Sequence, residues 1–162
     1  MTNFTADLSF GRESETHFAN YFSNTSWTPT LAPNYKFPDY DVSISSGSST
    51  ITFEIKTDRW TPKTNNVAIE IGRDGEPTGL QTTKADYFVI RVKDIYYGVK
   101  TSTLKQYIED NAEFLRVKQV GDGERTTCVL LPFYEFKNMT VFAINDMVLI
   151  QSLLPIIKDN AK

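Results

Sequence analysis

Cysteine and histidine are almost absent from this sequence, with one of each among its 162 residues. The single thiol, Cys128 in the apolar segment TTCVLLPF, excludes a disulfide framework and fits a buried position in a protein from a reducing compartment. The same shortage excludes a zinc site built from Cys and His ligands. Catalysis by a Ser/His/Asp or Cys/His group would need His17 beside a nucleophile. We expect His17 instead to be exposed or hydrogen-bonded on a helix.

Targeting and membrane signals are missing as well. The start, MTNFTADLSFGRESE, has neither the basic region nor the apolar core of a secretory signal. The longest apolar segment, VFAINDMVLIQSLLPII (141–157), is interrupted by Asn, Asp, Gln and Pro and is too polar to span a membrane. We therefore expect a cytoplasmic protein with no membrane partner.

An excess of positive charge is also lacking, since the net charge is −3 and the pI is near 5.2. This argues against a surface that coats nucleic acid without specificity. A local basic patch around an acidic metal site stays compatible with it, because a bound cation changes the sign of the site. The turn-rich segment GRDGEPTGL (72–80) is not followed by the G-K-[ST] of a phosphate loop, so it predicts only a turn.

What is present is the composition of one globular domain, with 40% apolar and 13% aromatic residues, and we expect a single domain over residues 1–162. Residues 11–22 predict a helix, because Glu15, Phe18 and Phe22 fall on one face of it, and 24–38 predict a loop. Further strands are predicted over 39–45, 50–57, 66–71, 86–93, 95–99, 126–133 and 140–144, and further helices over 102–115 and from about residue 146. This order of elements predicts an α/β (α+β) layered fold.

The segment FPDYDVSISSGSSTITFEIKTD (37–58) predicts a β-hairpin with Gly47-Ser48 at its turn. In that register, paired positions sum to 95. The apolar pairs are then Val42 with Phe53 and Ile44 with Ile51, and the polar pairs on the other face are Ser43 with Thr52, Asp41 with Glu54 and Asp39 with Lys56. A slip of one residue would set apolar residues against polar ones, so the pattern selects this register.

Two opposed carboxylates repel each other, and a cation between them removes that cost. Asp41 and Glu54 therefore suggest a site for Mg²⁺, which takes one or two carboxylates together with waters and a substrate phosphate. Lys56 points the same way and is placed to orient or deprotonate an attacking water, or to offset charge on a phosphate. The same residues also fit an ordinary exposed strand face, on which Lys56 simply pairs with Asp39.

At these residues the chain resembles the PD-(D/E)xK nuclease superfamily. The motif is present as Pro38-Asp39, with Asp41 just beyond, followed by Glu54-Ile55-Lys56 after the turn. The resemblance implies a restriction-endonuclease-like fold, a central mixed β-sheet flanked by helices. It also implies that Mg²⁺ (or Mn²⁺) is bound by the acidic residues, which activates water. The hairpin register favours Asp41 as the metal ligand, and Asp39, in the literal PD pair, is the second choice.

Two further groups extend the resemblance. Resolvase-like members carry a glutamate on the first helix in a G-x-x-x-E-like setting, and Gly11 and Glu15 match it. The resemblance therefore implies that Glu15 is a third metal ligand. The alternative is that Glu15 is an acid near the helix N-terminus that the helix dipole favours. The segment PTGLQTTKADYFV is similar to a stretch of phage-type nucleases. It nominates Gln81, Thr83 and Lys84 as phosphate contacts at a helix start, the alternative being an ordinary helix cap.

The sequence thus favours a metal-dependent deoxyribonuclease, resolvase-like and so specific for a DNA structure, with Asp41, Glu54, Lys56 and Glu15 as catalytic residues. The resemblance also suggests a phage protein acting in a host cell. A non-catalytic nucleic-acid-binding or protein-interaction module of the same fold is the alternative. A third hypothesis is a structural domain that oligomerises through 141–157, a segment that would also offer the enzyme a homodimer surface.

Overall fold

A computed structural model of the chain describes residues 4–34, 36–148 and 150–161. Residues 1–3 of the start and residue 149 of the segment 141–157 lie outside this description. The helices are α1 (Phe4–Asn20), α2 (Thr61–Thr64), α3 (Thr101–Asp110), α4 (Phe133–Asn138) and α5 (Ile150–Asn160), with short 3₁₀ turns η1 (Gly79–Gln81) and η2 (Asp122–Glu124). Within the described residues, none of these helices is long and apolar enough to cross a lipid bilayer.

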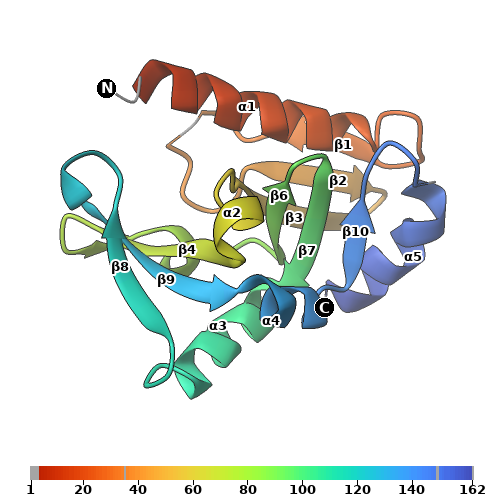
Figure 1. The fold of residues 1–162 in the computed structure, drawn as a ribbon. Helices are drawn as coiled ribbons and strands as arrows, with labels where there is room; N and C mark the ends of the chain where they lie inside the picture. Colours follow the sequence, from red (N-terminus) through yellow and green to blue (C-terminus); the bar gives the residue numbers. More distant parts are fainter. Residues whose placement is uncertain (1–3, 35, 149, 162) are drawn as a thin grey trace.

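A six-stranded mixed sheet forms the centre of the molecule and confirms the predicted fold class (Figure 1). Its strands, in spatial order, are β1 (Thr28–Leu31), β2 (Val42–Ser46), β3 (Ser49–Thr57), β6 (Tyr87–Val92), β7 (Ile95–Lys100) and β10 (Phe142–Ile144). The central pair, β3 and β6, is parallel, and the other neighbours are antiparallel. β6 is buried along nearly its whole length, as expected for a strand that is covered on both faces.

The predicted hairpin and its register are confirmed. Val42 pairs with Phe53, Ser43 with Thr52 and Ile44 with Ile51, as the alternation of apolar and polar residues requires. Gly47 has a φ of 59°, a left-handed conformation that the first central position of this turn needs and that glycine adopts without strain.

The predicted loop over 24–38 is wrong in part, because it contains β1, which pairs with β2 at the edge of the sheet. The helix predicted over 102–115 is also too long, since α3 ends at Asp110. The helix predicted over 11–22 exists, but it begins at Phe4 and ends at Asn20. The remaining predicted strands and the C-terminal helix are confirmed, with boundaries shifted by a few residues.

A second sheet lies beside the first, and the sequence pattern does not distinguish its strands from those of the central sheet. Its strands, in spatial order, are β5 (Glu76–Pro77), β4 (Asn66–Arg73), β9 (Thr126–Pro132) and β8 (Arg116–Val120). In Figure 1, α1 runs along one side of the central sheet, whereas β4, β8 and β9 extend away from it on another side. The chain between β3 and β6 passes through this second sheet, and that path brings the segment 82–86 back to Asp39, just before the start of β2.

Two apolar cores flank the central sheet. The first joins α1 and α5 to one face of it and includes Phe18, Phe22, Phe53 and Tyr87. The second fills the space between the other face, the second sheet and α3, and it includes Phe88, Ile90, Val129, Leu131 and Leu104. Because side chains alternate along β3, residues 52, 54 and 56 point away from the first core.

Candidate active site

Asp41 lies at the point where the chain enters β2, one residue before the last hairpin pair. Its backbone N–H donates to the carbonyl of Phe53 at 2.9 Å, and its own carbonyl accepts from Ala32 at 2.8 Å. Its carboxylate turns onto β3, where Oδ2 accepts the backbone N–H of Ile55 at 2.7 Å. The Asp41 carboxylate is therefore held against the Glu54–Ile55 peptide. The β-ladder ends at the pair Val42–Phe53, so the predicted cross-strand pair of Asp41 with Glu54 is not part of it.

Glu54 is a buried carboxylate with both oxygens engaged. The residue is 7% exposed. Its Oε1 lies 2.6 Å from the Lys56 ammonium, and its Oε2 accepts the hydroxyl of Thr83 at 3.1 Å. A buried carboxylate requires a partner charge or hydrogen-bond donors. The structure supplies one cation, the Lys56 ammonium, and one donor, the Thr83 hydroxyl.

The charges of this group perturb one another. Burial raises the pKa of Asp41 to about 7; Lys56 and the Ile55 N–H lower it, whereas Glu54 and Glu15 add to the rise. Burial alone would lower the pKa of Lys56, but the carboxylates of Glu54 and Asp41 outweigh it and raise that pKa. Shifts of this kind occur at functional sites and also in structural ion-pair networks.

Glu15 approaches this group from α1, although its own partner is Arg12. The Glu15 Oε2 atom lies 2.9 Å from Arg12 Nη1, and the Glu15 side chain is 13% exposed. Arg12 also donates to the carbonyl of Ala32 at 3.2 Å, which ties α1 to the residue that contacts the Asp41 backbone. Glu15 thus acts on Asp41 through its charge, and its role as a metal ligand stays a prediction.

The predicted pairing of Asp39 with Lys56 is wrong. The Asp39 carboxylate lies 3.1 Å from the ammonium of Lys84. The Asp39 backbone carbonyl accepts the Lys84 N–H and shares the single hydroxyl proton of Thr83 with Glu54 Oε2. The chain joins the β2–β3 ladder only at Val42, so Asp39, three residues earlier, has no partner in the ladder and does not face Lys56. Asp41 is therefore the better placed of the two candidate acids.

The segment around Thr83 differs from the predicted helix start. The short turn η1 ends at Gln81, and residues 82–86 form no helix. Thr83 is 3% exposed and contacts the Glu54 carboxylate, whereas Gln81 is exposed. Glu70 on β4 is a further neighbour of the site, because its charge contributes to the raised pKa of Lys56. The sequence carried no signal for the Thr83–Glu54 contact, which joins residues 29 positions apart.

The donor atoms fit a hard divalent cation. Mg²⁺ and Mn²⁺ favour oxygen ligands, and Mg²⁺ uses one or two protein carboxylates while substrate and water complete its shell. Asp41 and Glu54 provide those carboxylates, and among the described residues none donates a hydrogen bond to Asp41 Oδ1. Across residues 4–34, 36–148 and 150–161, no group of three or more His, Cys, Asp or Glu residues is arranged to hold a metal ion.

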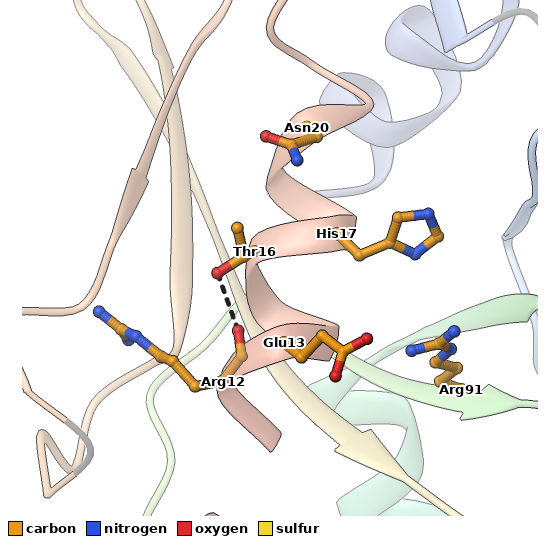
Figure 2. Close-up of a pocket in the computed structure, with 6 residues that line it drawn as sticks. All are labelled: Arg12, Glu13, Thr16, His17, Asn20 and Arg91. Carbon is orange, nitrogen blue, oxygen red and sulfur yellow. Dashed lines mark hydrogen bonds between the residues drawn. The ribbon is translucent and has the colours of Figure 1, made fainter. Parts of the chain in front are cut away.

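An open groove runs along the exposed side of α1, beside β6 (Figure 2). Its lining residues are Arg12, Glu13, Thr16, His17, Asn20 and Arg91. Figure 2 shows Glu13 and Arg91 pointing toward each other and Thr16 bonded to the Arg12 carbonyl, at 2.8 Å. His17 Nδ1 is 3.0 Å from the Tyr96 hydroxyl, so His17 is a hydrogen-bonded histidine, as expected. Asp41, Glu54 and Lys56 do not line this groove.

Comparison with known proteins adds a structural likeness only. No family model matches the sequence, and no curated protein matches it. Among solved structures, the chain is similar to a bacterial homing endonuclease, I-Ssp6803I, with a TM-score of 0.48 and 14% sequence identity, over 65% of this chain and 74% of that one. A match at this level does not identify an activity for the chain.

Proposed function

We propose that the chain is a divalent-metal-dependent nuclease that hydrolyses phosphodiester bonds of DNA. The observation that carries the proposal is the position of the Asp41 carboxylate on the Ile55 N–H, between a buried Glu54 and its partner Lys56. Buried, mutually perturbed charges of this kind cost stability, and function is the ordinary reason for retaining them. A mixed sheet covered on both faces supplies the rigid support that such a site needs.

In this proposal Asp41 and Glu54 hold Mg²⁺ or Mn²⁺. When bound there, such an ion would supply Lewis-acid chemistry to the scissile phosphate and to the attacking water. Lys56 keeps its proton, because the neighbouring carboxylates raise its pKa. It therefore offsets negative charge on the phosphate and orients the water rather than accepting a proton from it. Thr83 fixes the orientation of Glu54 through their hydrogen bond.

A non-catalytic nucleic-acid-binding or protein-interaction module of the same fold is the second candidate. It is favoured by the internal pairing of the carboxylates, since Glu54 is bonded to Lys56 and Glu15 to Arg12. Charges that are satisfied within the chain need no metal. On this view the site is a structural ion-pair network, and removing its charges would change stability without removing any activity.

A cleavage assay separates the two candidates. Linear, supercoiled and branched DNA, together with RNA, would be incubated with Mg²⁺, Mn²⁺ or EDTA and the wild-type chain. We expect metal-dependent cutting that falls by about 10²-fold or more in Asp41→Asn, Glu54→Gln and Lys56→Met. Glu76→Gln is the matched control, because Glu76 is an exposed acid of the second sheet. An absence of cutting on every substrate, with no metal binding by calorimetry, would leave the binding module as the better candidate.

A further inference from the structure

A second cleft opens between the segment after η1 and the start of α3, and the proposed mechanism does not use it. Its volume is about 290 Å³, and its lining includes Thr83, Lys84, Lys100, Thr101, Ser102 and Lys105. Three lysines thus gather at one cleft of a chain whose net charge is −3. Among its described lining residues only Asp86 is acidic, and that carboxylate already accepts the N–H and hydroxyl of Thr52, at 2.8 and 2.9 Å.

Thr101 provides the observation that points to a ligand. The residue lines the cleft and is only 5% exposed, yet its hydroxyl has no hydrogen-bond partner among the described residues. Its backbone N–H is used, because it donates to the Asp86 carbonyl at 3.0 Å. A buried hydroxyl without a partner costs free energy, and buried polar groups of native proteins are nearly always paired. A ligand oxygen in the cleft would supply the missing acceptor.

The same cleft contains the start of a helix. α3 begins at Thr101 and runs for ten residues, no side chain caps it, and its first turn carries no acidic residue. The first N–H groups of an α-helix have no partner within the helix, and the helix dipole adds a partial positive charge there. Together with the Ser102 hydroxyl and the nearby lysines, these groups form the kind of site that binds phosphate.

The cleft adjoins the candidate active site through Thr83. The Thr83 hydroxyl donates to Glu54 Oε2 at 3.1 Å, and the Thr83 carbonyl accepts from the Lys105 ammonium at 3.2 Å. Lys84, the next residue, is 75% exposed on its side chain and pairs with Asp39. One residue therefore contacts both the proposed metal ligand and a lysine of the cleft.

We propose that this cleft is a phosphate-binding subsite, which holds a backbone phosphate of the nucleic acid beside the phosphodiester placed at Asp41 and Glu54. This assignment to nucleic acid rests on the proposed function. The phosphate accepts hydrogen bonds from the Thr101 hydroxyl and from N–H groups of the first turn of α3 that follow Thr101, and the lysines offset its charge. The two sites share Thr83, so a phosphate in the cleft adds binding energy for the nucleic acid beside the proposed cleavage site.

The first test measures binding of inorganic phosphate by calorimetry, with no metal and no DNA. Ser102→Asp places a negative charge at the start of α3, where the dipole favours it, so we expect equal or higher thermal stability and at least tenfold weaker phosphate binding. Ser102→Asn matches the size of the aspartate variant without its charge; it loses only the hydroxyl, so it should weaken phosphate binding far less than Ser102→Asp does. Thr101→Val removes only the unpartnered hydroxyl and should weaken binding several-fold without loss of stability. Equal binding by all four chains, or none by the wild type, would overturn the subsite.

The second test follows a labelled DNA duplex, first by anisotropy in EDTA and then in the cleavage assay. We expect Ser102→Asp to raise both the dissociation constant and KM about tenfold while kcat changes little. In Lys105→Met the slope of log affinity against log salt concentration should fall by about one released ion. Lys118→Met should leave that slope unchanged, because Lys118 is an exposed residue of β8. If the wild type cuts no nucleic acid, the proposed nuclease fails, and the EDTA measurement still tests the subsite. Unchanged DNA affinity in Ser102→Asp would overturn the subsite even if cleavage is observed.

Discussion

Replacing Lys56 by methionine tests whether the charged group on β3 needs a cation. Methionine keeps most of the aliphatic stem and removes the ammonium that lies 2.6 Å from Glu54 Oε1. Glu54 then retains the Thr83 hydroxyl as its donor, and its side chain is only 9% exposed. An ionised carboxylate would remain in a largely buried position beside Asp41.

The size of the effect follows from the exposure of the two partners. Breaking a fully buried ion pair costs about 3–5 kcal/mol, whereas an exposed pair is worth about 0.2–1 kcal/mol. The Lys56 side chain is 38% exposed and that of Glu54 is 9% exposed, so solvent screens the pair in part and a loss of about 2 kcal/mol lies between these limits. For a chain of this length that loss corresponds to a melting temperature lower by about 6 °C.

A double-mutant cycle, followed by urea denaturation in EDTA, would measure this coupling. In Glu54→Gln/Lys56→Met the buried charge is gone, so the double variant should recover about half of the loss or more. Mg²⁺ should then stabilise Lys56→Met more than the wild type, because the ion takes the place of the ammonium, and at about 100 times its dissociation constant it adds about 2.7 kcal/mol.

Two results would refute this reasoning. If Lys56→Met is as stable as the wild type in EDTA, the carboxylates do not depend on a cation. If Mg²⁺ stabilises Lys56→Met no more than it stabilises the double variant, Glu54 is not where the ion binds. Lys118→Met is the control for the loss of one positive charge, since Lys118 is exposed on β8.

Three further predictions concern the scaffold. Gly98→Ala should destabilise the chain by about 1–3 kcal/mol in urea denaturation, because the added methyl group would collide with the Phe142 ring on the neighbouring strand. Gly11→Ala is the control: its methyl group would contact no other residue, so this variant should be as stable as the wild type or more stable. Burial raises the pKa of the Cys128 thiol to about 11, so an alkylating reagent near neutral pH should label Cys128 only after unfolding, as followed by mass spectrometry; fast labelling of the folded chain would contradict this. The Arg125 guanidinium lowers the pKa of Asp74. The pair therefore contributes stability above the pKa that Asp74 has in the unfolded chain, and this stability is lost as the pH falls through the pKa of the folded chain. The difference in urea midpoint between the wild type and Arg125→Gln should close in acid, and a difference that widens there would contradict the assignment.

Local pattern was enough to predict the hairpin and the face on which its charged residues lie. The alternation of apolar and polar residues from 41 to 56 allows one register, since a slip of one residue would bury the polar set. The same pattern placed Glu54 and Lys56 on one face and Asp41 next to them. The helical period placed Glu15 on the face of the first helix that packs on the sheet, and its charge acts on Asp41 there. The pairing of Glu15 with Arg12 was not predicted.

Elements that depend on distant partners were missed or misplaced. β1 is a short edge strand of sequence TPTL, and its pairing with β2 rather than its own composition makes it a strand. The separation of β4, β5, β8 and β9 into a second sheet depends on which strands pair, and periodicity carries no information about that choice. α3 stops at Asp110, where Asn111 closes it, and the chain then enters β8.

The sequence by itself determined the strands of the hairpin, their register and the proximity of Asp41, Glu54 and Lys56, because these follow from a two-residue period within one hairpin. Only the tertiary structure decided that Thr83 orients Glu54, that Asp39 pairs with Lys84 and that the start of α3 forms a basic cleft beside them. Those contacts join segments from different parts of the chain. Their positions depend on how the two sheets pack, which no local pattern specifies.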